Sequence, residues 1–176
     1  MIDIETAYRK SCETPSDIYE HLPFLHEVAN GKQVVELGVR SGESSKAFLA
    51  GGAQLWSVDI GAQPFSHPNW TFMQGDDRDP AVASRAPNCD VLFIDSSHGY
   101  EHTLFELWVY GAKVRNGGLI VLHDTELETP AGEEAGPAFP VKKALEEYSQ
   151  EQDYSYFLRP YCWGLGVITV DLTGRV

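Results

Sequence analysis

The stretch VLFIDSSHGYEH runs from Val91 to His102. Four apolar residues end abruptly in Asp95, and a histidine follows three positions later. A second stretch, GGLIVLHDTE from Gly117 to Glu126, repeats this form with His123 and Asp124. Short continuous apolar runs are typical of strands that are buried on both faces. Because the carboxyl ends of parallel strands meet at one edge of a sheet, we expect the two acidic ends to converge on one site.

The same pattern, an apolar run followed by a turn and a helix, recurs along the chain. It predicts strands at 32–38, 53–60, 69–76, 89–95 and 118–124, two more within 154–172, and helices at 15–29, 42–52, 79–86, 100–115 and 139–151. This alternation predicts an α/β protein with a Rossmann-like, doubly wound and mostly parallel sheet. We expect about seven strands, the last of them antiparallel, with helices on both faces of the sheet.

Length and composition fit one domain. The chain has 176 residues, of which 43% are apolar and 22% charged, so we expect a single domain over 1–176. Within it we expect a helical segment at 1–30 and a mobile acidic loop, rich in glycine and proline, at 126–138. No apolar run reaches the roughly 18 residues of a membrane span, and the polar N-terminus is unlike a signal peptide.

The net charge and the cysteine content indicate which partners and which cellular compartment to expect. The formal net charge of −13, without any cluster of lysine and arginine, argues against a nucleic-acid partner, and the lack of a long apolar run argues against a membrane partner. Three widely spaced cysteines, Cys12, Cys89 and Cys162, favour a reducing compartment, and we expect a cytoplasmic protein. The oligomeric state stays open, with a homo-oligomer as one alternative.

The first expected strand ends in VVELGVRSGESS, residues 34–45, which suits a nucleotide-like ligand. Gly38 permits a tight turn and close approach of a ligand, and the helix start near Gly42 offers free backbone N–H groups. Asp59 lies 21 residues after Gly38, where an acid binds the ribose hydroxyls in dinucleotide sites. A third close glycine, which a pyrophosphate needs, is missing. The pattern therefore favours S-adenosylmethionine (SAM) over a dinucleotide, and a plain βα turn is the simpler alternative.

Each part of SAM has an expected partner in this sequence. Asp59 is expected to hold the ribose, and the acids that follow the third strand are expected to contact the adenine amino group. The cofactor residues predicted in this way are Glu36, Gly38, Ser41, Gly42, Asp59, Asp76 and Asp77. Glu36, Gly38 and Ser41 are expected to line the methionine end.

Several of these motifs together resemble a known family. VVELGVRSGESS, SVDI, GDD, VLFIDSSHGYE and NGGLIVLHDT resemble the ordered motifs of class I SAM-dependent methyltransferases, over about residues 17–148. The combination of IDSSHGYE with GGLIVLHD is most similar to the macrocin-type and rhamnosyl O-methyltransferases. The resemblance implies methyl transfer to a hydroxyl of a small acceptor, such as a sugar or glycoside.

The resemblance also implies roles at the two strand ends. Asp95 and Asp124 would bind a divalent metal, magnesium or manganese, and His98 would be the general base beside the catalytic Asp95. Imidazole accepts protons near neutral pH, which a weakly nucleophilic hydroxyl requires. His123 stands where the family has a second carboxylate, and imidazole suits softer metals better than magnesium. Three alternatives stay open: a hard metal on Asp95 and Asp124 alone, a softer metal that includes His123, or no metal. His102 is expected to be solvated.

Other activities compete with this hypothesis. A short-chain dehydrogenase would require a Tyr-x-x-x-Lys pair, whereas Tyr110 and Lys113 are one residue short of it. Metal-independent methyl transfer to nitrogen or carbon is a second alternative, and a non-catalytic SAM-binding domain is a third. Arg159, Tyr161 and Trp163 in the tail are expected in the core, in an interface or in an acceptor pocket.

Overall fold

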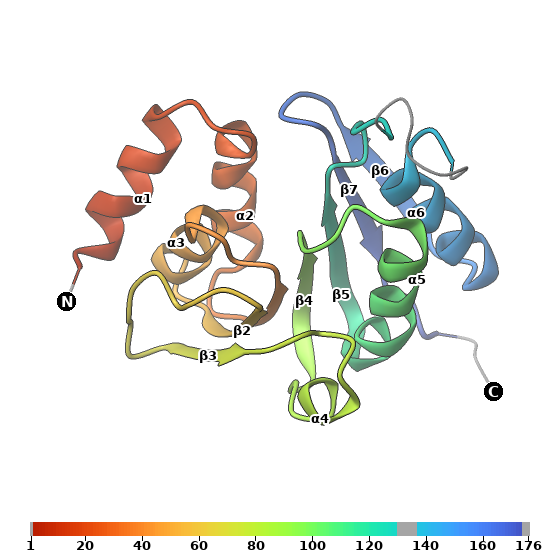
Figure 1. Ribbon diagram of the computed structural model, residues 1–176, viewed down its shortest axis with the longest axis horizontal. Coiled ribbons are helices and arrows are strands. Elements are labelled where there is room, and N and C mark those ends of the chain that lie inside the picture. The colour runs from red at the N-terminus through yellow and green to blue at the C-terminus, as the bar shows by residue number, and fades with distance from the viewer. Residues whose placement is uncertain (1, 130–136, 174–176) are drawn as a thin grey trace.

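A seven-stranded sheet forms the centre of the protein (Figure 1). The computed structural model describes residues 2–129 and 137–173. The strands are β1 Gln33–Leu37, β2 Gln54–Asp59, β3 Trp70–Gln74, β4 Cys89–Ile94, β5 Val114–His123, β6 Ser155–Arg159 and β7 Leu165–Thr169. Their order is β3-β2-β1-β4-β5-β7-β6, and the neighbours are parallel except β5 with β7 and β7 with β6. Strand β7 therefore runs against the others, and the predicted fold class is confirmed.

Helices cover both faces of this sheet. They are α1 Ile4–Glu13, η1 Tyr19–His21, α2 Leu22–Val28, α3 Glu43–Ala50, α4 Pro80–Ala83, α5 Tyr100–Val109, η2 Gly111–Lys113 and α6 Pro140–Glu151. Figure 1 shows α1, α2 and α3 together on one side of the sheet, and α5 and α6 on the other. The sheet is thus the middle of three layers, which is the arrangement that continuous apolar strands require.

The apolar run of β4 shows why the pattern is continuous. Val91 and Phe93 are buried in the cluster that contains α2 and α3, whereas Leu92 and Ile94 are buried in the cluster that contains α5 and α6. Side chains alternate between the two faces of a strand, so a strand covered on both faces needs apolar residues at every position. Burying each such side chain stabilises the fold by about 1.5–3 kcal/mol.

The junction before β5 differs from the prediction. The expected helix over 100–115 ends earlier, because α5 stops at Val109 and a 3₁₀ turn follows it. The glycines at 117 and 118 lie inside β5, and the pairing of β4 with β5 shifts register between Cys89 and Val91. A Cβ on Gly118 would lie 2.7 Å from the carbonyl oxygen of Asp90, so this irregular pairing requires a glycine.

Two segments outside the sheet, 1–30 and 126–138, carry predictions from the sequence. Within the segment 1–30, the described residues form α1, η1 and α2, and both α1 and α2 pack against α3. Of the loop predicted over 126–138, residues 130–136 lie outside the described residues. Among the helices that the structure describes, none has the length and apolarity to cross a membrane.

Candidate active site

A cavity of about 770 Å³ opens where the carboxyl ends of β1, β2, β3, β4 and β5 meet. Strand order reverses between β1 and β4, and such a point is where ligands bind in open α/β sheets. The volume suits a nucleoside-sized ligand. The predicted site residues that line it are Gly38, Ser41, Asp59, Asp76, Asp77, Asp95, His98 and Asp124, whereas Glu36, Gly42 and His123 are outside its lining.

Gly38 brings the ends of β1 and β4 together. Its φ is +86°, and a Cβ at this position would lie 2.1 Å from the backbone oxygen of Asp95. The amide of Asp95 in turn donates to the carbonyl of Leu37 at 2.8 Å. Only glycine combines this backbone conformation with so close a contact. The turn after β1 therefore places Asp95 at the floor of the cavity.

Glu36 stabilises this turn through hydrogen bonds. It does not line the cavity, although it was expected at the methionine end of SAM. The side chain is fully buried and accepts hydrogen bonds from the hydroxyls of Ser44, Ser45 and Ser57 at 2.6–2.8 Å. Burial raises the pKa of Glu36 to about 7, although the three hydroxyls act to lower it. Glu36 thus joins β1, β2 and the start of α3 through one carboxyl group.

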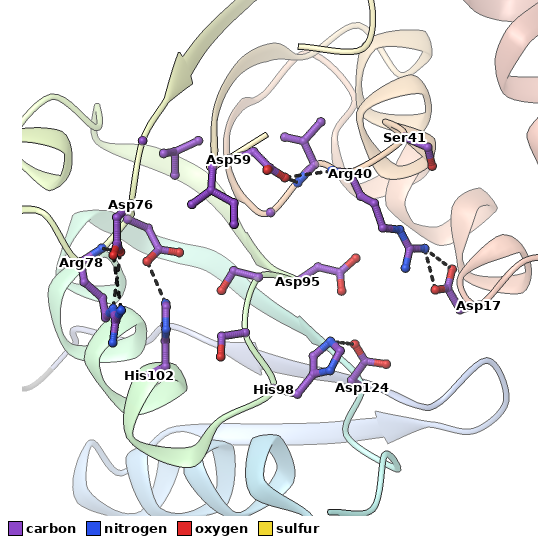
Figure 2. A pocket seen from close by; sticks show the side chains of 18 of the residues that line it. Asp17, Arg40, Ser41, Asp59, Asp76, Arg78, Asp95, His98, His102 and Asp124 are labelled. Carbon is purple, nitrogen blue, oxygen red and sulfur yellow. Dashed lines mark hydrogen bonds and ion pairs between the residues drawn. The ribbon is translucent and has the colours of Figure 1, made fainter. Parts of the chain in front are cut away.

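Asp59 holds the loop after β1 and also faces the cavity (Figure 2). Its Oδ2 accepts from the amides of Val39 at 2.6 Å and Arg40 at 2.9 Å, and its Oδ1 accepts from the amide of Gly61 at 2.6 Å. Burial acts to raise the pKa of Asp59, but these amide bonds prevail and lower it. A carboxylate has about four acceptor positions, so one position is left for a ligand hydroxyl.

The two acids after β3 have different surroundings. Asp76 is exposed and pairs with Arg78, whereas Asp77 is buried and lies 2.7 Å from Nε2 of His102. The prediction that His102 is solvated was wrong, because α5 places its ring between Asp77 and the buried Glu106. Burial, together with the nearby charge of Asp77, raises the pKa of Glu106 well above its usual range. Asp76, Asp77, Arg78 and His102 line one part of the cavity, whereas Glu106 is not part of its lining.

The ends of β4 and β5, which lead to Asp95 and Asp124, meet at the opposite side of the cavity. Nε2 of His98 lies 2.8 Å from Oδ2 of Asp124 (Figure 2). Nδ1 of His123 lies 3.2 Å from Oδ1 of Asp95 and 3.1 Å from the same Oδ2 of Asp124. Asp124 has φ +62°, a left-handed conformation that non-glycine residues adopt mainly where the surroundings hold them. The predicted convergence of Asp95, His98 and Asp124 is present in the structure.

Charge interactions shift the pKa values of this group. Burial acts to lower the pKa of His123, but hydrogen bonds to Asp124 and Asp95 prevail and raise it to about 10. The bond to Asp124 raises the pKa of His98. Burial acts to raise the pKa of Asp124, and the bonds from the two histidines lower it below its usual range. Burial raises the pKa of Asp95.

The donor set does not fit the metal that the resemblance implied. Ligand atoms of Asp95, His98 and Asp124 lie within 4.8 Å of one another, but His123 is already bound to both carboxylates. Nε2 of His123 faces the carbonyls of Asp17 at 3.1 Å and Cys162 at 2.8 Å, so neither ring nitrogen is free to bind a metal. Two like unit charges about 4 Å apart repel by about 4 kcal/mol near a protein surface, roughly a thousandfold in affinity. A cation would meet this repulsion beside His123.

Further residues also line the cavity, and most of them have no local signal in the sequence. Arg40 binds both oxygens of Asp17, at 2.7 and 2.5 Å, and so ties the N-terminal segment to the turn after β1. Leu127 and Trp163 line the cavity, and Trp163 is 53% exposed. Trp163 was one of the tail aromatics for which an acceptor pocket had been considered.

Comparisons with known proteins agree with this geometry. Residues 35–125, more than half of the chain, match the family model described as a methyltransferase domain. No curated protein matches the sequence. Solved structures share the fold. One is MycE, a methyltransferase of the mycinamycin biosynthetic pathway in complex with Mg, S-adenosylhomocysteine (SAH) and mycinamycin VI, at 19% identity with a TM-score of 0.67. The alignment covers 90% of this chain and 50% of MycE, so this chain spans about half of MycE's length.

Two further structures match almost end to end. A candidate caffeoyl-CoA O-methyltransferase from Staphylococcus aureus has 14% identity and a TM-score of 0.71, with 96% of this chain and 92% of that chain covered. A protein from Corynebacterium glutamicum has 16% identity and a TM-score of 0.68, with 100% and 93% covered. At such identities the likeness shows the fold, while the family match rests on the sequence itself. The chain therefore belongs to the methyltransferase domain family.

Proposed function

We propose that this chain transfers the methyl group of SAM to a hydroxyl of a small acceptor, with a sugar or glycoside as the acceptor class. The observation that carries the proposal is the ion pair between Nε2 of His98 and Oδ2 of Asp124, 2.8 Å apart, at one end of the cavity. Figure 2 shows this pair apart from the pair of Asp76 and Arg78, with Asp95 between them. The cavity thus has one end for a nucleoside and another end for proton transfer.

The cofactor fits this division of the cavity. In the proposal Asp59 binds the ribose with its remaining acceptor position, and Asp76 and Asp77 bind the adenine end. The turn with Gly38 and Ser41 binds the methionine end. The sulfonium methyl group then points toward Asp95 and the acceptor.

Proton removal is assigned to His98. A carboxylate that accepts from one ring nitrogen fixes the tautomer and leaves the other nitrogen as the base, as in other carboxylate–histidine pairs. In the proposal the proton on Nε2 of His98 faces Asp124, so Nδ1 takes the proton from the hydroxyl group of the methyl acceptor. The acceptor oxygen attacks the methyl carbon, a C–O bond forms, the C–S bond breaks and SAH leaves. Because the donor set does not fit a metal, no part of this step is assigned to magnesium or manganese.

The acceptor side of the cavity has an exposed aromatic surface. Trp163 and Leu127 line the cavity beside Asp124. A flat ring at the edge of a polar site suits stacking of a sugar or another ring, while the polar groups select the hydroxyl. The sugar class itself rests on the motif resemblance, and the MycE complex with mycinamycin VI is consistent with a small-molecule acceptor.

Two measurements test the proposal in sequence. Calorimetry with SAM and SAH should show binding by the wild-type chain, and loss of both would refute a methyltransferase. Transfer of labelled methyl groups should then be followed with a panel of glycosides, phenols and amines, with and without a chelator. Turnover of glycosides should dominate and survive chelation.

Matched variants separate the roles of the residues. His98→Ala should bind SAH as the wild type does and lose turnover, whereas a non-catalytic SAM-binding domain would show no turnover in either chain. Trp163→Ala should weaken acceptor binding. Tyr156→Ala changes an aromatic residue on β6 that is also exposed, at 42%, but does not line the cavity, and it should have no effect.

A further inference from the structure

We propose that His123 takes the place of a metal ion in this site, as a buried cation that holds the two carboxylates and makes the chain independent of divalent metals. The effect of His123 on catalysis rests on the proposed function, whereas its role as a structural cation does not. The ring forms four polar contacts, two at each nitrogen. These contacts decide where its protons lie.

The Nε2 atom of His123 must carry a proton. It faces the backbone oxygens of Asp17 at 3.1 Å and Cys162 at 2.8 Å, and carbonyl oxygens only accept hydrogen bonds. The Nδ1 atom faces carboxylate oxygens of Asp95 and Asp124 at 3.2 and 3.1 Å. A proton on Nδ1 satisfies both contacts. If that proton moves to Asp95, the protonated carboxyl group donates a hydrogen bond to Nδ1 instead. The ring then still offers no free lone pair to a metal ion.

His123 is a positioning residue rather than a catalytic one. Its side chain is 2% exposed and is not part of the cavity lining. Through Asp124 it acts on His98, because Oδ2 of Asp124 receives bonds from both rings. A positive charge stabilises a carboxylate pair at two adjacent strand ends, and here a side chain of β5 supplies it.

The same ring holds a strained turn of the tail. Tyr161, Cys162, Trp163 and Gly164 all have left-handed φ values, of 74°, 43°, 62° and 80°. Such a run persists only where neighbours fix it. His21 contacts the carbonyl of Tyr161 at 3.0 Å, His123 that of Cys162, and the amide of Glu126 donates to that of Trp163 at 2.7 Å. A metal bound by the carboxylates alone would not reach this turn, whereas the His123 ring binds both.

Titration with manganese tests the proposal without SAM or acceptor. Free Mn²⁺ is measured by electron paramagnetic resonance with the wild type, His123→Glu and His123→Gln. The wild type should bind Mn²⁺ no more tightly than about 1 mM. His123→Glu, which exchanges the cation for a third carboxylate, should bind at least about a hundredfold more tightly. His123→Gln removes the charge without adding a carboxylate and should stay closer to the wild type than to His123→Glu.

Micromolar binding by the wild type would overturn the proposal. So would a folded His123→Glu variant, checked by circular dichroism, that gains no affinity. If His123→Glu does not fold, nuclear magnetic resonance of the wild type decides. Broadening of the His123 ring signals by one equivalent of Mn²⁺ would overturn the proposal, and unchanged signals would support it. Failure of methyl transfer would refute the proposed function but leave these titrations unaffected.

Discussion

Replacing His123 by glutamine should change how the stability of the fold depends on pH. The pKa of His123 is raised to about 10 in the folded chain, against about 6.5 for an unfolded histidine. The folded state therefore holds one more proton than the unfolded state between these values. The stabilisation from His123 is fully present below pH 6.5 and is lost as the pH rises toward 10.

The size of the effect follows from proton linkage. One extra proton in the folded state lowers the free energy of unfolding by about 1.4 kcal/mol per pH unit. Between pH 7.5 and 9 this amounts to about 2 kcal/mol, and the whole shift corresponds to an upper limit of about 5 kcal/mol. The side chain is nearly fully buried, so solvent screens these interactions little. His123→Gln cannot release this proton.

Urea unfolding, followed by tryptophan fluorescence at several pH values from 7.5 to 9, measures the difference. The wild type should lose about 2 kcal/mol more than His123→Gln over this interval. Other groups with raised pKa values, such as Glu36 and Glu106, are present in both chains, so the comparison subtracts most of their contribution. His67→Gln, the same change at a histidine between β2 and β3 that does not line the cavity, is measured in parallel as the matched control. Parallel pH dependences for wild type and His123→Gln would refute the reasoning.

Other changes should affect the cavity in distinct ways. Gly38→Ala should destabilise the fold by more than about 3 kcal/mol in urea unfolding, because the new Cβ would overlap the carbonyl of Asp95. His98→Ala should lower kcat by roughly 10²- to 10⁴-fold in methyl-transfer assays while calorimetry shows unchanged SAH affinity. The rate should rise with pH through the raised pKa of His98, because only the neutral ring accepts a proton. Asp124→Asn removes the bond that raises this pKa, so the rise in rate should move to lower pH. Trp163→Ala should raise the KM for the acceptor by up to about tenfold with little change in kcat.

The sequence predicted the backbone of this site better than its side-chain partners. The apolar runs before Asp59, Asp95 and Asp124 place these acids at strand ends, and parallel pairing then brings the ends to one edge. Gly38 could be identified from the sequence because a turn in which another backbone segment approaches closely requires a glycine. Such features follow from local periodicity and from the geometry of the sheet.

Contacts between distant segments could not be read from the sequence. His102 was expected in solvent because the residues near it in the chain give no sign of a partner. Its Nε2 lies 2.7 Å from Oδ1 of Asp77, which is 25 residues earlier. Glu36 was expected at the methionine end of SAM as part of the motif after the first strand, but three serines around it satisfy its oxygens. Each of these positions was decided by the packing of α3 or α5 on the sheet.

The orientation of the proposed base depends on residues that are far from it in sequence. His98 is oriented by Asp124, Asp124 is held in a left-handed conformation beside His123, and His123 is fixed by the carbonyls of Asp17 and Cys162. The N-terminal segment, β5 and the tail therefore act on one chain of ion pairs and hydrogen bonds that ends at the base. A displacement of Cys162 would rotate the His123 ring, weaken its bond to Asp124 and leave that carboxylate to His98 alone. The arrangement of the base should thus respond to changes in the tail that never touch the acceptor.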